Sequence, residues 1–247
     1  VYNQTSDAYF ATLSEAILAS SAHDVLILAP GSYVEDFPDI THSLTIRCDD
    51  GMASLTRATP LTVDGRAILN VPGNLGVHLT VVGLEISGAR RPGPDPNGAA
   101  ILHEIGNGDL TIERCYIHGN ENGILVGNTN AFSPATGTNI VIRDSEFSAT
   151  GAPPGSAYAA GGKCHNIYIN AVTSVLIENS YIHSVFSQGH QIKSRAATNI
   201  IVNNRIEDLP QLGRTGYGSS YSIDISNGGV AVIRDNVIAK GPYSVNK

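Results

Sequence analysis

Short alternating patterns of apolar and polar residues recur along this chain. Three strand-like segments resemble one another, and they are His165–Asn170, His190–Arg195 and Tyr221–Ser226. A second β pattern follows each of them, at Val175–Ile182, Asn199–Ile206 and Val230–Ile238, and related segments lie at Val77–Ile86, Leu110–Ile117 and Ile140–Phe147. The apolar members alternate with a period of two, as half-buried strands require. A unit repeated at intervals of 24 to 35 residues predicts a solenoid whose turns stack on one another.

Stacking brings residues that are distant in sequence into register. Aligning the repeats on Ile167, Ile192 and Ile223 gives two outward columns, one of Tyr168, Lys193 and Asp224 and one of Asn170, Arg195 and Ser226. Stacked strands lie about 4.8 Å apart, so neighbours within a column should touch. The same alternation places Asn166, Gln191 and Ser222 in a third polar column. We therefore predict a polar surface on one wall of the solenoid. The alternative is an ordinary exposed sheet with a Lys193–Asp224 salt bridge, which stabilises little.

The first residues of the three segments, His165, His190 and Tyr221, form a further column that alternation directs toward the interior or the bend. A stacked, hydrogen-bonded histidine pair is the favoured interpretation. The other is that one histidine acts as a general base, because histidine titrates near neutral pH. His118 and His183 follow equivalent isoleucines in a bend, and for them we expect a structural role.

Asparagine and aspartate recur where the second β pattern bends. Their amides can form hydrogen-bond ladders between stacked turns, and both residue types tolerate the left-handed backbone conformation. We interpret these residues as structural, and they are Asp144, Asn179, Asn203, Asn204, Asp235 and Asn236.

The amino-terminal region differs from the repeats. Residues 8–22 carry the one helical period of the chain, with Phe10, Leu13, Ile17 and Leu18 expected on one face. A strand and a turn follow at Val25–Val34. Such a segment would cover the core and the unpaired strand edge that the first turn of a solenoid exposes.

Composition agrees with a folded β protein. The 247 residues are 42% hydrophobic and 15% charged and include 26 glycines, which suits short strands joined by tight bends. A net charge of −7 argues against a general nucleic-acid partner, and no apolar run is long enough to span a membrane. The three cysteines cannot form a disulfide framework, and Cys115 sits in an apolar pattern typical of a core residue.

We find no domain boundary and expect one solenoid over residues 1–247, with the cap and first strand in residues 1–35. Segments rich in Gly, Pro, Ser, Ala and Thr predict loops at Arg90–Gly98, Asn128–Asn139 and Ala149–Lys163. Gly241–Lys247 carries no cap pattern, so we expect either a longer natural chain or a partner over that edge.

The helix, the apolar strand and the following Pro-Gly-Ser-Tyr-Val-Glu at residues 30–35 resemble the amino-terminal cap of right-handed parallel β-helix proteins of the pectate lyase-like group. This resemblance implies an all-β, right-handed parallel β-helix with a short amino-terminal capping helix. The group includes polysaccharide lyases, polygalacturonases and alginate epimerases. The chain also resembles bacterial secreted β-helix proteins with similar phrases around His165, His190 and Tyr221.

The resemblance implies the chemistry of the alginate and chondroitin B lyases. In those enzymes a lysine removes a sugar proton, an arginine assists the leaving group, and calcium binds the substrate carboxylate. Lys193 and Arg195 match the first two roles, but the asparagine and glutamate set that would hold calcium is not found. We therefore expect calcium as an optional cofactor only. The aspartate cluster of polygalacturonases is also missing.

The function expected is β-elimination on an acidic, uronate-containing polysaccharide. The expected catalytic residues are Lys193, Arg195, Tyr168, His190 and His165, and the expected substrate-binding residues are Asn166, Asn170, Gln191, Asp224 and Tyr221. Lysine serves as a base only if its pKa is lowered by desolvation or by Arg195, an effect that Asp224 opposes.

The alternatives are a hydrolase or epimerase with Asp224 as acid or base, and a non-catalytic glycan-binding or structural β-helix. No nucleic acid or membrane partner is expected, and the oligomeric state expected is a monomer or weak oligomer. Secretion or a periplasmic location follows from the function and not from a visible signal.

Overall fold

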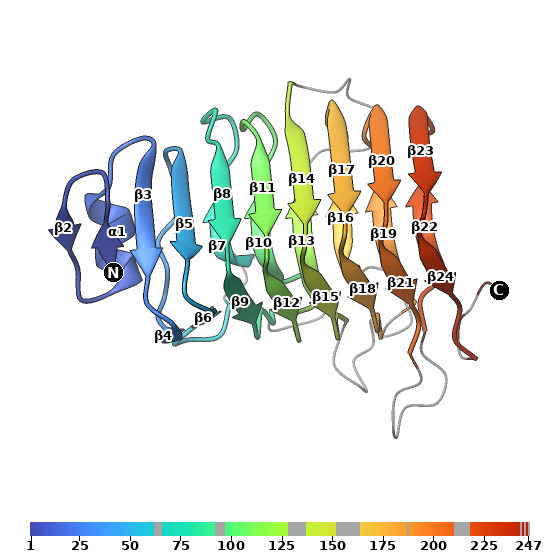
Figure 1. Cartoon of the computed structure of the whole chain (residues 1–247), viewed down its shortest axis with the longest axis horizontal. Coiled ribbons are helices and arrows are strands. Elements are labelled where there is room, and N and C mark those ends of the chain that lie inside the picture. Colours follow the sequence, from blue (N-terminus) through green and yellow to red (C-terminus); the bar gives the residue numbers. More distant parts are fainter. Residues whose placement is uncertain are drawn as a thin grey trace.

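A computed structural model of the chain describes residues 1–61, 66–91, 97–127, 137–151, 164–186, 188–209, 218–242, 244 and 246. Strands dominate these residues and form three sheets that run along one long axis (Figure 1). We call them sheets A, B and C. The predicted loops at Asn128–Asn139 and Ala149–Lys163 lie largely outside the described residues, and so does the middle of Arg90–Gly98.

Sheet A has ten strands. In spatial order they are β2 (Ala8–Tyr9), β1 (Tyr2–Asn3), β3 (Asp24–Leu28), β5 (Leu44–Cys48), β8 (Leu79–Val82), β11 (Leu110–Glu113), β14 (Asn139–Arg143), β17 (Ser174–Glu178), β20 (Thr198–Val202) and β23 (Val230–Arg234). The pairs that involve β1 are antiparallel, and the pairs from β3 onward are parallel.

Sheets B and C are parallel throughout the described residues. Sheet B consists of β4 (Gly31–Val34), β6 (Ala53–Thr56), β9 (Leu84–Ser87), β12 (Tyr116–His118), β15 (Glu146–Ser148), β18 (Tyr181–His183), β21 (Arg205–Glu207) and β24 (Val237–Ala239). Sheet C consists of β7 (Ala67–Val71), β10 (Ala99–His103), β13 (Asn122–Val126), β16 (Ile167–Ile169), β19 (His190–Ser194) and β22 (Tyr221–Ile225).

One turn of the solenoid, here called a coil, passes through sheet A, then sheet B, then sheet C. Strands β11, β12 and β13 form such a coil, and each pairs with its counterparts one coil before and one coil after. The parallel β-helix predicted from the sequence is therefore confirmed. Each predicted second β pattern proves to be two strands, one in sheet A and one in sheet B.

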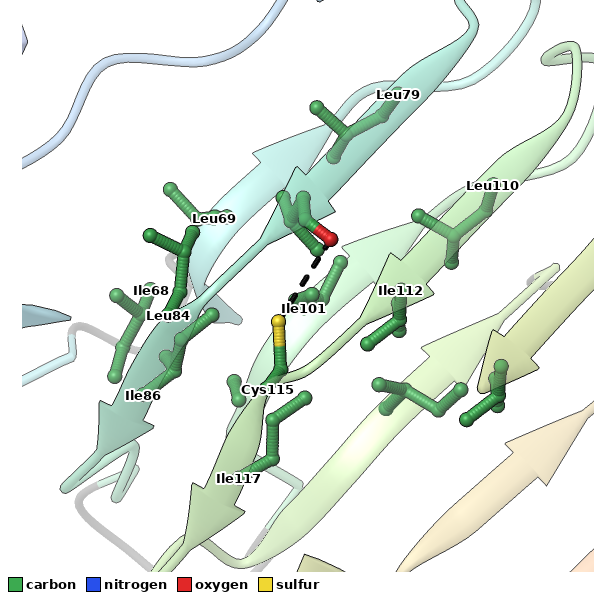
Figure 2. Close-up of a cluster of buried hydrophobic side chains, with 14 of the residues drawn as sticks. Ile68, Leu69, Leu79, Leu84, Ile86, Ile101, Leu110, Ile112, Cys115 and Ile117 are labelled. Carbon is green, nitrogen blue, oxygen red and sulfur yellow. Dashed lines mark hydrogen bonds between the residues drawn. The ribbon is translucent and has the colours of Figure 1, made fainter. Parts of the chain in front are cut away.

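The core lies between the three sheets and continues from coil to coil. Figure 2 shows a section of it, with Ile101 from sheet C, Ile112 from sheet A and Ile117 from sheet B pointing toward one another. These side chains are fully buried, and burying one of this size contributes about 1.5–3 kcal/mol.

Cys115 belongs to the same core, as predicted. Its thiol is buried and donates to the carbonyl oxygen of Val81 at 3.7 Å (Figure 2). Burial raises the pKa of this thiol to about 12, so Cys115 is unreactive. Cys48 and Cys164 are also buried, and neither is in a disulfide.

The corner between sheets A and B is a tight bend that repeats in each coil from Arg114 onward. The first residue of the bend has a left-handed backbone, with φ of 50° at Arg114, 52° at Asp144 and 51° at Asn179. The side chain of the next residue accepts a main-chain N–H from the preceding coil: Ser145 from Cys115 at 3.1 Å, and Asn204 from Ser180 at 2.9 Å. The structural role predicted for bend residues is thus confirmed at Asn204 and, by the same contact, at Asn236.

Helix α1 (Leu13–Ala19) covers the first coil with Leu13, Ala16 and Ile17 buried. It is shorter than the predicted segment, because residues 8 and 9 form β2. Thr12 and Glu15 form a capping box at its start. The expectation that Leu18 lies on the buried face is wrong, since Leu18 is 74% exposed. It directly follows the buried Ile17, and consecutive residues are rotated by about 100° around a helix axis.

Glu35 joins this helix to the first coil. Its carboxylate accepts the main-chain N–H groups of Leu13 at 3.1 Å and Ser14 at 2.8 Å. These amides begin the helix and have no partner within it, and the positive end of the helix dipole favours a carboxylate there.

We expect Glu35→Ala to destabilise the protein by about 1 kcal/mol, as loss of a helix cap does. Urea denaturation followed by circular dichroism measures this loss. Glu35→Gln keeps one acceptor oxygen and should lose less. Equal stability of Glu35→Ala and the wild type would show that this contact does not hold the cap.

Candidate functional site

The outer wall of sheet C carries the residues singled out from the sequence. Tyr168 in β16 pairs with Lys193 in β19, and Lys193 pairs with Asp224 in β22. The predicted column is therefore present, on neighbouring strands about 4.8 Å apart. Tyr168 packs with Ala99, Leu102 and Leu125 in a cluster separate from the main core, which places the column on the outer side.

The alternation changes at the start of the sheet C strands, where two consecutive residues face inward. In β10 both Ala100 and Ile101 belong to the main core, while Ala99 and Leu102 belong to the outer cluster. The same step occurs in the later coils. The first residue of each inward pair therefore faces inward where alternation predicts outward, and the residue before the pair faces outward where alternation predicts inward.

Asn166 and Gln191 show one consequence. We expected them on the outer surface, and this is wrong, because both are fully buried. They lie at the corner between sheets B and C, where Asn166 donates to Gln191 at 2.6 Å and Gln191 donates to Asp208 at 2.7 Å. These amides link successive coils and offer no surface to a substrate.

His165, His190 and Tyr221 show the other consequence. We expected these side chains to point toward the interior or the bend, and instead their rings form a row beside Tyr168 on the outer side of sheet C. Ring centroids are 4.9 Å apart for His165 and His190 and 5.1 Å apart for His190 and Tyr221. His165 and His190 are nevertheless buried, at 2% and 8% exposed, whereas Tyr221 is 48% exposed.

The expected histidine pair is present and hydrogen-bonded, but its rings are tilted by 41° to one another and are not stacked. The main-chain N–H of His190 donates to Nδ1 of His165 at 2.9 Å, so a neutral His165 carries its proton on Nε2. Burial holds the pKa of His165 well below its usual value, and the charges of His190, Lys193 and Arg195 act in the same direction. His165 is therefore neutral at pH 7.

His190 makes a specific contact with Asp224. Its Nε2 lies 3.3 Å from the carboxylate oxygen Oδ2, which also accepts the Ser226 hydroxyl at 2.8 Å. Burial and Lys193 lower the pKa of His190, and Asp224 opposes them.

Arg195 and Tyr168 form the centre of the site. Nη1 of Arg195 donates to the Tyr168 hydroxyl and to Oδ1 of Asn170 at 2.9 Å. Its guanidinium carbon lies 5.4 Å from the centroid of the Tyr168 ring. The guanidinium is held by one phenol and one amide, both from the preceding coil.

Lys193 completes this group. Its ammonium lies 5.4 Å from the centroid of the same Tyr168 ring. The Lys193–Asp224 salt bridge considered from the sequence is not formed: no ion pair joins Lys193 to a carboxylate among the residues that the structure describes, and Asp224 bonds His190 and Ser226 instead. Burial and then Arg195 lower the pKa of Lys193, against the opposing charge of Asp224.

Asn122 also supports the site, although we did not predict it from the sequence. Its side-chain oxygen accepts the main-chain N–H of His165 at 2.9 Å and so fixes the start of that strand. Extending the alignment to Ile124, which pairs with Ile167, would have placed Asn122 in the column of His165.

The described residues do not fit a calcium ion. No group of three or more His, Cys, Asp or Glu side chains able to hold a metal occurs in the part of the chain that the structure describes. On the outer wall of sheet C, Asp224 is already bonded to His190 and Ser226, with Lys193 on the adjoining strand. Calcium needs six to eight oxygen ligands.

Within the described ranges, no helix is long and apolar enough to cross a membrane.

Comparison with known proteins shows a likeness of fold but no family. No family model matches the chain, and no curated protein matches it. Among solved structures, the chain is similar to a mutant of the PL6 family alginate lyase AlyGC, with a TM-score of 0.45 and 15% sequence identity. The match covers 93% of this chain and 38% of that protein, so the chain spans less than half of its length.

The buried histidines predict how stability depends on pH. A histidine whose pKa is lower in the folded state stabilises the fold fully above its unfolded pKa of about 6.5, and this contribution is lost as the pH falls toward the folded value. We expect the urea midpoint to fall when the pH is lowered from about 7.5 to about 5.5, a range above the usual pKa of carboxylates.

His165→Gln keeps an acceptor but does not titrate, so it should show a smaller fall in midpoint over the same range. The comparison needs the midpoint at each pH for both proteins. An identical pH dependence in the variant and the wild type would contradict the burial of a neutral His165.

Proposed function

We propose that the outer wall of sheet C is the active site of a polysaccharide lyase that cleaves a uronate-containing glycan by β-elimination. The observation that carries the proposal is the grouping of Lys193 and Arg195 around Tyr168, with no carboxylate paired to Lys193 among the described residues. Two cations and a phenol in one place suit an anionic substrate and a proton transfer.

Arg195 binds the uronate carboxylate in this mechanism. Tyr168 and Asn170 hold its Nη1 group, and the structure records no partner for Nη2 among the residues it describes. A fixed guanidinium with free donors can neutralise a carboxylate. Neutralising it makes the proton on the adjacent sugar carbon more acidic.

Lys193 removes that proton. A lysine acts as a base only in its neutral form, and burial beside Arg195 lowers its pKa in that direction. Asp224 opposes this effect from the next coil, but its carboxylate also serves His190 and Ser226. The absence of a direct ion pair with Lys193 removes the main objection to lysine as the base.

Tyr168 supplies a proton to the leaving oxygen. Its hydroxyl oxygen accepts from Arg195, which leaves the phenolic proton free to be donated to the leaving oxygen. The carbon–hydrogen bond breaks toward Lys193, the glycosidic carbon–oxygen bond breaks, and a carbon–carbon double bond forms. The leaving oxygen takes the Tyr168 proton, and solvent restores both side chains.

His165 and His190 position the other groups. His165 packs against Tyr168 with ring centroids 5.1 Å apart, and His190 bonds Asp224. A hydrolase would need a second carboxylate near Asp224. Within β19 and β22, Asp224 is the sole carboxylate, which favours elimination over hydrolysis on this wall.

Incubation with a panel of uronate polymers tests the activity. The unsaturated product absorbs ultraviolet light, so we expect absorbance and reducing ends to rise together. Reducing ends without absorbance would indicate hydrolysis. Retention of a polymer without turnover would indicate a binding module. Either result would contradict the proposal.

We expect Lys193→Ala to lower kcat by about 10²–10⁴-fold, as loss of a general base does, without unfolding the chain. Arg195→Ala should lower kcat/KM by about 10²-fold or more, because the developing charge loses its partner. Arg143→Ala removes an exposed cation from sheet A and serves as the matched control. Near-normal turnover of either site variant would show that the site is placed wrongly.

The rate should rise with pH as Lys193 loses its proton. Asp224 raises the pKa of Lys193, so Asp224→Asn should lower that pKa and move the rising limb of the pH–kcat profile to lower pH. A limb that stays in place or moves to higher pH would exclude Lys193 as the titrating base.

A further inference from the structure

A pocket of about 550 Å³ lies at the corner between sheets A and B, away from the wall of sheet C. Its lining includes Tyr116, Tyr181, Glu146, Asp144 and Asn179. Two aromatic rings and several oxygen acceptors in a shallow pocket are features of a ligand site. The chemistry proposed for sheet C uses none of these residues.

The two tyrosines belong to a unit that the chain builds twice. Tyr116 stacks on His118, and Tyr181 stacks on His183, each with ring centroids 4.1 Å apart. The sequence Tyr-Ile-His at residues 116–118 and 181–183 produces this contact, because residues two apart in a strand share a face.

Each histidine of the unit is fixed by a glutamate from the preceding coil. Nε2 of His118 lies 2.8 Å from Glu85, and Nε2 of His183 lies 3.1 Å from Glu146. The hydroxyl of Tyr181 donates to Glu207 at 3.1 Å. These contacts hold the tyrosine rings in place before any ligand arrives, which lowers the entropic cost of binding.

The register sets the spacing of the rings. Tyr116 pairs with Glu146, and Glu146 pairs with Tyr181, so the tyrosines are two strands apart, or about 9.6 Å. Glu146 lies between them. An aromatic ring, a carboxylate and a second aromatic ring thus follow one another along the solenoid axis.

We propose that this row is a second carbohydrate site, which binds a neutral oligosaccharide lying along the solenoid axis. Tyr116 stacks against the apolar face of one sugar ring with the ring face that His118 does not cover. Both faces of Tyr181 are covered, by His183 and Arg205, so its ring edge contacts the second sugar. Glu146 and Asp144 accept hydrogen bonds from sugar hydroxyls. This proposal is independent of the lyase activity proposed for sheet C.

Charge favours a neutral sugar over a uronate at this row. Glu146 and Asp144 would repel a substrate carboxylate. The cations nearby are already paired, Arg114 with Glu113 at 3.7 Å and Arg205 with Glu207 at 2.8 Å. Arg205 also lies over the Tyr181 ring, 4.9 Å from its centroid. It therefore borders the site, but its charge is already paired with Glu207.

Isothermal titration calorimetry with cellohexaose, laminarihexaose, mannohexaose and trigalacturonate tests the proposal. We expect the wild type to bind at least one neutral hexasaccharide. The double variant Tyr116→Ala/Tyr181→Ala should bind it at least about tenfold more weakly, which corresponds to about 1.4 kcal/mol. Tyr9→Ala removes an exposed tyrosine at the amino-terminal end and should bind as the wild type does.

Glu146→Gln provides a second test that leaves both rings in place, and it should also weaken binding. Lys193→Ala should keep full affinity, because Lys193 lies on sheet C. The proposal fails if no neutral hexasaccharide binds, or if the folded tyrosine and Glu146 variants bind as tightly as the wild type. It also fails if Lys193→Ala abolishes the binding, which would place the sugar on sheet C.

Discussion

Parallel main-chain pairing between one coil and the next is the constraint on which the rest of this structure depends. It fixes a spacing of about 4.8 Å and a register in which Tyr168, Lys193 and Asp224 are neighbours although they are 25 and 31 residues apart. A slip of one residue would turn the buried isoleucines outward, so burial of the core enforces the register. Hydrogen bonds at the corner between sheets A and B reinforce it in the later coils.

The register also separates two kinds of surface on an acidic protein. Sheet C gathers Lys193 and Arg195 beside an aromatic ring, in a setting where burial lowers the pKa of Lys193 and of His165. Sheet B instead repeats tyrosine, histidine and glutamate. A net charge of −7 repels polyanions at long range, so an anionic substrate would depend on the local charge of sheet C.

Much of this architecture could be predicted from the sequence, because alternation and repetition are local signals. They gave the solenoid, the column of Tyr168 and Lys193, and the capping helix. The directions of Asn166 and His165 could not be obtained in this way. Two consecutive residues face inward at the start of the sheet C strands. The first of these two positions holds Ala100, Asn166 or Gln191 in different coils, without an apolar pattern that would reveal it.

The sequence alone determined which residues share a strand and which columns they form, since both follow from the period of the backbone and from the repeat. Only the tertiary structure decided which partner each charged group takes. Asp224 bonds His190 and Ser226 and forms no described ion pair with Lys193, while Arg195 reaches back one coil to Tyr168 and Asn170. These choices, and the pKa shifts that follow from them, depend on the paths of long side chains and on burial by neighbouring coils, which no local pattern encodes.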